Sequence, residues 1–134
     1  MSDDIARECE RLVRRFAVYG DSGEHDRLAG LFVEDGVFIR PSDPEHPIVG
    51  RAAILDSFRR RPRDRVTRHF CANFLITEQG PQTASGISYV LLFAGNAADG
   101  RVSRQLVGEY RDRFVRTEDG WRFSRREGSI SLTA

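Results

Sequence analysis

Residues 65–94 carry the sequence RVTRHFCANFLITEQGPQTASGISYVLLFA, and this stretch decides the fold. It holds two long runs rich in β-branched and aromatic residues, with Gly80-Pro81 between them, and two similar runs follow. The four runs are 65–78, 82–94, 101–117 and 121–130. Turn residues between β-rich runs predict consecutive antiparallel strands. All four runs exceed the usual length of about five or six residues. Strands that long bend, and a strongly curved sheet encloses a cavity.

The first half of the chain predicts helices. Apolar residues recur at helical spacing from Ile5 to Ala17, so we expect an amphipathic helix that breaks at Gly20–Gly23. Further on, the pattern predicts a short helix with Leu28, Leu31 and Phe32 on one face, a strand at 37–39, a loop at 40–49 with three prolines, and a helix from Gly50 to Arg59. This order predicts one α+β domain spanning 1–134, a cone-shaped barrel whose curved, mixed and largely antiparallel sheet wraps around N-terminal helices.

The charge balance excludes several classes of partner. The 134 residues include 21 basic and 20 acidic ones, so no global field attracts nucleic acid or a membrane surface. Every basic residue is arginine. This composition is typical of a GC-rich bacterium, and the lack of lysine excludes Schiff-base chemistry.

The sequence also predicts a cytoplasmic protein. Its two cysteines, Cys9 and Cys71, fall in different elements and indicate no disulfide framework. The acidic start lacks the basic and apolar regions of a signal peptide. No apolar run approaches the roughly 20 residues that span a bilayer.

Two residues are the candidate catalytic pair. Asp21 follows the first predicted helix, and His69 lies within the first long strand. Imidazole suits proton transfer near neutral pH, and a carboxylate bonded to one ring nitrogen fixes the tautomer and stabilises the imidazolium. Such a pair in an apolar pocket suits dehydration, elimination, isomerisation or aldol-type cyclisation. Equally, an Asp at a helix end is often only a cap, and a strand His is often a hydrogen-bonded core residue.

The ordered pieces of the chain resemble a known fold family. The resembling pieces are Phe16–Phe32, Phe32–Phe38, Gly50–Ile54, Arg68-His69 with Asn73, Gly108–Asp112 and Gly120–Phe123. In this order they are similar to the SnoaL-like members of the nuclear transport factor 2-like superfamily. At the Asp–His positions the chain resembles scytalone dehydratase and lindane dehydrochlorinase, which pair a helix-end Asp with a cavity-facing strand His. Those positions match Asp21 and His69.

The resemblance implies two functions of different classes. The first is a cofactor-independent lyase or isomerase, dehydratase-like or cyclase-like, acting on a small, largely apolar ring or polyketide-like molecule. The second is a non-catalytic ligand-binding or assembly module, like the small subunits of ring-hydroxylating dioxygenases. The second reading predicts a filled pocket and no contact between Asp21 and His69.

Three further residues are candidates for substrate binding. Strand alternation places Asn73 on the same face as His69, where its amide would orient a substrate oxygen. Tyr19 is close to Asp21 along the chain, and Arg125 shares a predicted strand face with Trp121 and Phe123. Each has a structural alternative: Tyr19 as a core aromatic, and Arg125 on a solvated face.

Metal and cofactor sites are not expected. His25 and His46 lack partners at metal-ligand spacing, and no glycine-rich phosphate loop or dinucleotide fingerprint occurs. The basic run Arg59–Arg65 is read as a solvated helix end rather than a phosphate site. Alternation also puts Phe70 and Phe74 together on the outer face, which predicts a homo-oligomer, a dimer or trimer, that covers them.

Overall fold

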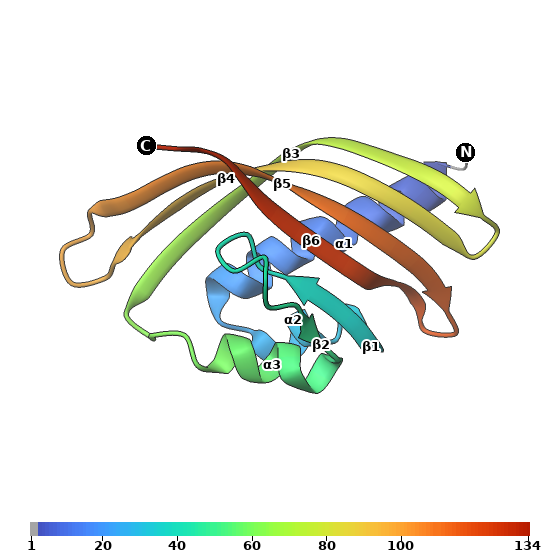
Figure 1. Ribbon diagram of the computed structural model, residues 1–134, viewed down its shortest axis with the longest axis horizontal. Helices are drawn as coiled ribbons and strands as arrows, with labels where there is room; N and C mark the ends of the chain where they lie inside the picture. The colour runs from blue at the N-terminus through green and yellow to red at the C-terminus, as the bar shows by residue number, and fades with distance from the viewer. Residues whose placement is uncertain (1–2) are drawn as a thin grey trace.

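A six-stranded sheet with helices on one side forms the architecture of the protein, which is described for residues 3–134 by a computed structural model. The elements follow the order α1 (Asp3–Ser22), α2 (His25–Ala29), β1 (Phe32–Ile39), β2 (Ile48–Val49), α3 (Arg51–Arg59), β3 (Arg65–Gly80), β4 (Thr83–Asn96), β5 (Val102–Thr117) and β6 (Gly120–Thr133). The long strands arch over the helices (Figure 1). The predicted α+β class is therefore confirmed, although the sheet stays open instead of closing into a barrel.

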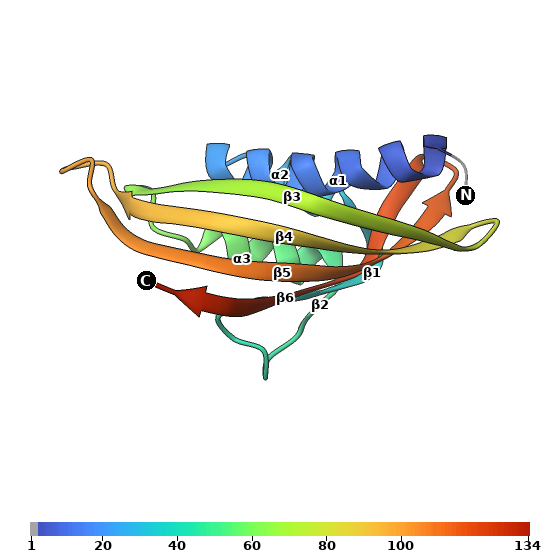
Figure 2. The same cartoon turned by 90° about the horizontal axis from the view of Figure 1, so that it is seen from above.

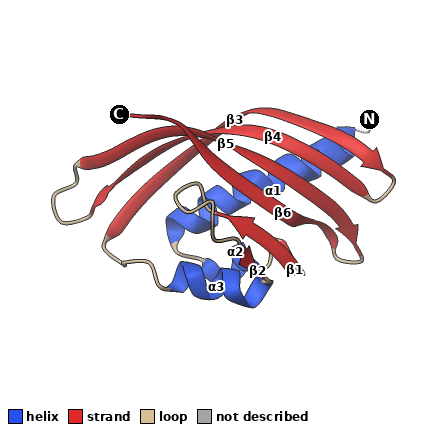
Figure 3. Ribbon diagram, in the orientation of Figure 1, coloured by secondary structure: helices blue, strands red, loops and turns tan. Residues whose placement is uncertain are grey.

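The sheet order is β2-β1-β6-β5-β4-β3. Strands β3 to β6 pair antiparallel with their chain neighbours, while β1 runs parallel to β6. This gives the mixed, largely antiparallel sheet expected from the turn residues. Seen from above, the long strands cross in front of α3 (Figure 2), and colouring by secondary structure shows the helices beneath the arch (Figure 3).

Several boundaries differ from the sequence prediction. Helix α1 continues past Gly20 and ends at Ser22, where Gly23 takes a positive φ of 76° that ends the helical path. Helix α2 ends at Ala29 and does not reach Phe32, which begins a strand longer than the predicted 37–39. The proline-rich segment contains the two-residue strand β2, because Ile48 pairs with Phe38.

The core lies between α1 and the inner face of the sheet. Phe16 of α1 is at its centre and makes edge-on contacts with Phe32, Phe38, Phe58, Tyr110 and Phe123 at centroid distances of 5.3 to 6.1 Å. Aromatic pairs in this arrangement stabilise beyond their buried area. Phe16 thus joins α1 to four other elements, β1, α3, β5 and β6, and holds α1 across the sheet.

Among the register shifts of the long strands, two β-bulges affect which side chains face the core. In β3, Ala72 pairs with Tyr89 and Leu75 with Ile87, so two residues face one, and Asn73 adopts a positive φ of 57°. In β6, Phe123 pairs with Phe114 and Arg125 with Arg113, which leaves Ser124 as the extra residue. A bulge shifts every later side chain of its strand to the opposite face.

Candidate active site

Asp21 and His69 meet at the edge of the core. Asp21 lies in the last turn of α1, and His69 lies on the inner face of β3 before the bulge. The His69 Nδ1 is 2.6 Å from the Asp21 Oδ1, and the His69 backbone N–H donates to the Oδ2 at 2.9 Å. The Thr67 hydroxyl donates to the Oδ1 at 2.8 Å. The carboxylate therefore accepts three hydrogen bonds from a single strand.

These bonds keep the carboxyl group of Asp21 ionised. Burial by itself raises the pKa of Asp21, but the hydrogen bonds from the His69 ring and backbone, with the Thr67 hydroxyl, bring it below its usual value of 3.8. An ionised carboxylate accepts and does not donate, so Nδ1 of His69 carries the proton. In the neutral imidazole the lone pair then lies on Nε2, as a general base requires.

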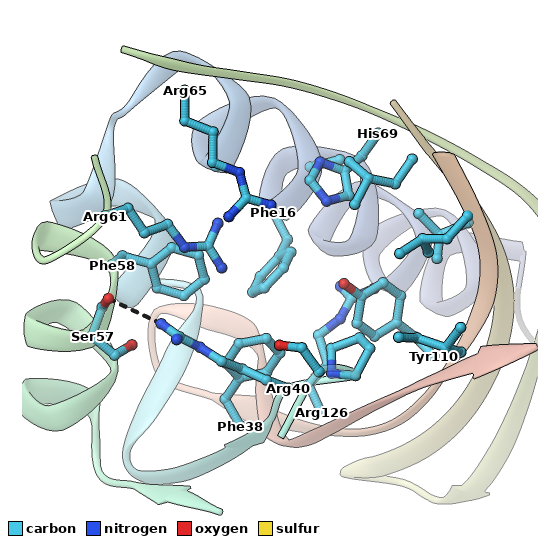
Figure 4. Close-up of a pocket in the computed structure, with 18 of the residues that line it drawn as sticks. Phe16, Phe38, Arg40, Ser57, Phe58, Arg61, Arg65, His69, Tyr110 and Arg126 are labelled. Atoms are coloured by element: carbon cyan, nitrogen blue, oxygen red, sulfur yellow. Dashed lines mark hydrogen bonds between the residues drawn. The ribbon is translucent and has the colours of Figure 1, made fainter. Parts of the chain in front are cut away.

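His69 opens onto a cavity of about 540 Å³ between α1, α3 and the inner face of the sheet. Rings and aliphatic side chains form much of its wall, namely Phe16, Phe38, Phe58, Val90, Leu92, Leu106, Tyr110 and Ile130. Figure 4 shows His69 and Tyr110 on one side of this space and Arg61 and Arg65 on the other. Asp21 itself lies behind His69 and is not part of the wall.

A buried arginine completes the inner wall. Arg126 is fully buried, and its guanidinium lies 3.7 Å from the Tyr110 ring centroid and 4.4 Å from that of Phe16. Its Nε is 3.5 Å from Asp112 Oδ1, but none of its nitrogens has a hydrogen-bond partner. Burial raises the pKa of Asp112 to about 6, and the Arg126 charge opposes that rise. Buried donors are almost always satisfied, so these N–H groups, enclosed among aromatic rings, are an exception.

The structure does not bring the other predicted residues to the cavity. Asn73 is the bulged residue of β3, so the alternation that aligned it with His69 is broken. The bulge at Ser124 likewise turns Arg125 away, where it pairs with Glu127 at 3.3 Å, and brings Arg126 inward instead. Tyr19 packs against the core without lining the cavity.

The prediction that Phe70 and Phe74 share the outer face of the sheet is half right. Because Phe74 follows the bulge, it packs against the core, and the Arg14 guanidinium lies 4.7 Å from its ring centroid. Phe70 remains on the outer face and is 58% exposed.

The basic run was misread as a purely solvated helix end. Arg59 and Arg63 are exposed and do not line the cavity, but Arg60, Arg61 and Arg65 do. With Arg40, Arg104 and Arg126, they make six arginines in the wall, which includes no carboxylate among residues 3–134. Tyr110 also lines the cavity and was not predicted, although it lies within the resembling piece Gly108–Asp112.

Other titratable groups lack the features of His69. His46 also pairs with a carboxylate, at 2.6 Å from Asp43, but both side chains are exposed in the proline-rich loop. Cys71 lines the cavity as a free thiol, and burial raises its pKa, which disfavours the reactive thiolate. Across residues 3–134, no three His, Cys, Asp or Glu side chains converge as a metal site needs.

The comparison with family models decides the family. Residues 4–127 match the model of the SnoaL-like domain. The chain belongs to this SnoaL-like family. The resemblance seen in the sequence is thereby confirmed.

Solved structures agree with this family. The SnoaL-like chain resembles a candidate scytalone dehydratase from Novosphingobium aromaticivorans, with 27% identity, a TM-score of 0.81, and coverage of 96% of this chain and 85% of that one. A candidate aromatic ring hydroxylase from the same organism has 25% identity, a TM-score of 0.85, and coverage of 100% and 94%. A Catenulispora acidiphila protein in complex with S-DNPA has 25% identity, a TM-score of 0.77, and coverage of 96% and 95%.

Two other comparisons add less. Among curated proteins, none matches the SnoaL-like chain. Within the described part of the chain, no helix combines the length and the apolar character needed to cross a membrane.

Proposed function

We propose that the protein is a cofactor-independent lyase or isomerase, with dehydration of a small ring-containing or polyketide-like molecule as the reaction that its site suits best. The hydrogen bond of 2.6 Å between Asp21 and His69, at the wall of an open cavity, carries this proposal. The similarity to a candidate scytalone dehydratase supports it, and the S-DNPA complex of a related structure supports a small-molecule ligand.

The reaction would begin at the Nε2 of His69. This nitrogen takes a proton from a carbon beside a carbonyl group, while Asp21 stabilises the imidazolium through Nδ1. The buried positive charge of Arg126 at the cavity wall favours the negative charge that develops on the enolate oxygen. The C–O bond at the next carbon then breaks as the C=C bond forms, and the departing hydroxyl leaves as water with the proton returned by His69.

The alternative, a non-catalytic assembly module, fits the geometry less well. That function predicts a filled pocket and no Asp21–His69 contact. The cavity is open, and the two side chains are hydrogen-bonded.

The proposal is tested by proton chemistry on a panel of small cyclic β-hydroxy ketones. In deuterated buffer, NMR would follow both loss of water and exchange of the proton beside the carbonyl. We expect at least one ketone to exchange or dehydrate with added protein and not without it. No enzyme-dependent exchange across the panel would contradict proton abstraction from this class of substrate.

We also propose a homo-oligomer formed through the outer face of β3 and β4. Phe70, Leu75 and Tyr89 are 58%, 63% and 50% exposed on these strands. A contiguous apolar face of this kind is unusual on a monomer. Light scattering is expected to give more than the mass of one chain, and Phe70→Glu to lower it. The mass of one chain at every concentration would contradict the proposal.

A further inference from the structure

Three arginines form a cationic group on the side of the cavity that faces α3. Arg40 follows β1, Arg61 lies in the segment after α3, and Arg65 begins β3. We call these three residues the arginine rim. Figure 4 shows the Arg61 and Arg65 guanidiniums turned toward the interior. Two separate parts of the chain, Arg40 and the basic run, therefore place positive charge at one place.

No carboxylate of residues 3–134 forms an ion pair with the rim. Arg40 donates to the Ser57 carbonyl at 2.9 Å, but its buried Nε has no partner. The Arg61 guanidinium lies 4.2 Å from the Phe58 ring centroid and forms no ion pair. Arg65 likewise lacks a carboxylate partner among these residues. Burial and the charges of Arg40 and Arg65 lower the pKa of Arg61 to about 10, so it stays charged at neutral pH while its neighbours repel it.

Neighbouring arginines show that carboxylates pair with some of the charges near the end of α3. Arg59 pairs with Asp26 at 2.9 Å, and Arg60 pairs with Asp56 at 3.0 Å. These two carboxylates lie outside the cavity wall. Carboxylates are therefore present near the end of α3, yet none of them pairs with an arginine of the rim. Like charges held together without a counter-charge destabilise the protein unless something negative binds between them.

We propose that the cavity takes an anionic ligand, whose carboxylate or phosphate group binds the arginine rim while an apolar ring lies against Phe16 and Phe58. Planar guanidinium groups match the oxygens of both anions. The proposal refines the proposed function by naming the charge of its substrate. It replaces the expectation of a largely apolar ligand with a ligand that is apolar at one end and charged at the other.

The location of the rim also orients such a ligand. Arg61 lies across the cavity from His69, and the guanidinium of Arg65, which begins the strand that carries His69, reaches inward beside that of Arg61 (Figure 4). An anion held at the rim would direct the opposite end of the ring toward the His69 Nε2. The rim would therefore position the ligand, and His69 remains the group that meets the reacting atoms.

Calorimetric titration with three naphthalene probes tests the proposal. The probes are 2-naphthoate, 2-naphthyl phosphate and the neutral 2-naphthamide, which share one ring and differ in the charge of the substituent. We expect at least one anion to bind about ten-fold more tightly than the amide, because a charge-assisted hydrogen bond exceeds a neutral one. Comparison of the two anions identifies which group fits the rim.

Variants localise the effect. Arg61→Gln and Arg40→Gln are each expected to remove most of the preference for the anion. Arg63→Gln is the matched control, since Arg63 lies in the same segment but is exposed and outside the cavity wall. Equal binding of all three probes, or an equal loss in Arg63→Gln, would overturn the proposal. If Arg61→Gln fails to fold, Arg40→Gln decides by the same criterion.

The binding assay also separates this proposal from the proposed catalysis. His69→Gln is expected to keep the anion preference, because His69 is not part of the rim and the change removes none of its positive charges. Anion preference without turnover of any ketone would overturn the proposed reaction alone. Turnover of a neutral ketone by a protein that binds all three probes equally would overturn the rim proposal alone.

Discussion

Replacing Asp21 by Asn is expected to lower kcat by about 10⁴-fold, as loss of the corresponding carboxylate does in a Ser-His-Asp triad. An amide presents one oxygen and one NH₂ group, whereas the Asp21 carboxylate accepts bonds through both oxygens. If the amide nitrogen faces the His69 ring, Nδ1 becomes an acceptor and the proton moves to Nε2. His69 then no longer offers a base to the cavity.

The assay is the turnover of whichever ketone the protein dehydrates or exchanges. Thr67→Val removes one hydrogen bond but keeps the carboxylate, so we expect a loss of only about ten-fold or less. His46→Gln breaks the exposed Asp43–His46 pair and should leave kcat unchanged. Full turnover by Asp21→Asn with its fold intact by circular dichroism would contradict the role of Asp21.

Non-additivity distinguishes orientation of the base from a structural role. Residues that act as one unit lose their combined effect when either is removed. The Asp21→Asn/His69→Gln double variant is therefore expected to be no slower than His69→Gln alone. A further loss of about ten-fold in the double variant would show that Asp21 acts independently of His69.

Replacing Asp112 by Asn is expected to lower the free energy of unfolding by about 3 kcal/mol, because it leaves the buried Arg126 charge without its counter-charge. Urea unfolding measures this loss. Arg125→Met is the matched control: Arg125 is adjacent but part-exposed, and the change should stay within about 0.5 kcal/mol. The pair Asp112→Leu with Arg126→Met should recover much of the stability, since it removes both buried charges.

In the opposite single variant, Arg126→Met, the loss of folding stability is expected to depend on pH. Its buried Asp112 has a pKa raised from 3.8 to about 6 even with Arg126 present, and removal of Arg126 raises it further. Between these values the folded state holds a proton that the unfolded chain has lost, so stability increases as pH falls. Arg126→Met should lose less stability at pH 5 than at pH 8. A loss that is independent of pH would contradict an ionisable Asp112.

The sequence predicted features that depend on local pattern. Helical spacing and turn residues place most elements correctly, and the Asp21–His69 pair follows from a helix end and a strand that the family order brings together. The bulges at Asn73 and Ser124 have no such local signal, because their register depends on the neighbouring strand. The faces predicted for Asn73 and Arg125 were therefore wrong. The arginine rim escaped prediction because Arg40 is far along the chain from Arg61 and Arg65, and the basic run that holds these two has no local signal for which of its side chains face inward.

The bulge at Ser124 has a consequence for how relatives of this protein are compared. Phe123 is part of the core and Arg126 faces the cavity, although they lie three positions apart on one strand. A relative that lacks the extra residue would present its inward arginine one position earlier. An alignment that ignores the bulge would then match that arginine with the solvent-facing Arg125. Active-site residues on β6 should therefore be assigned in relatives by superposing the strands rather than by aligning the sequences. A single insertion or deletion in β6 can change which of its later residues face the cavity.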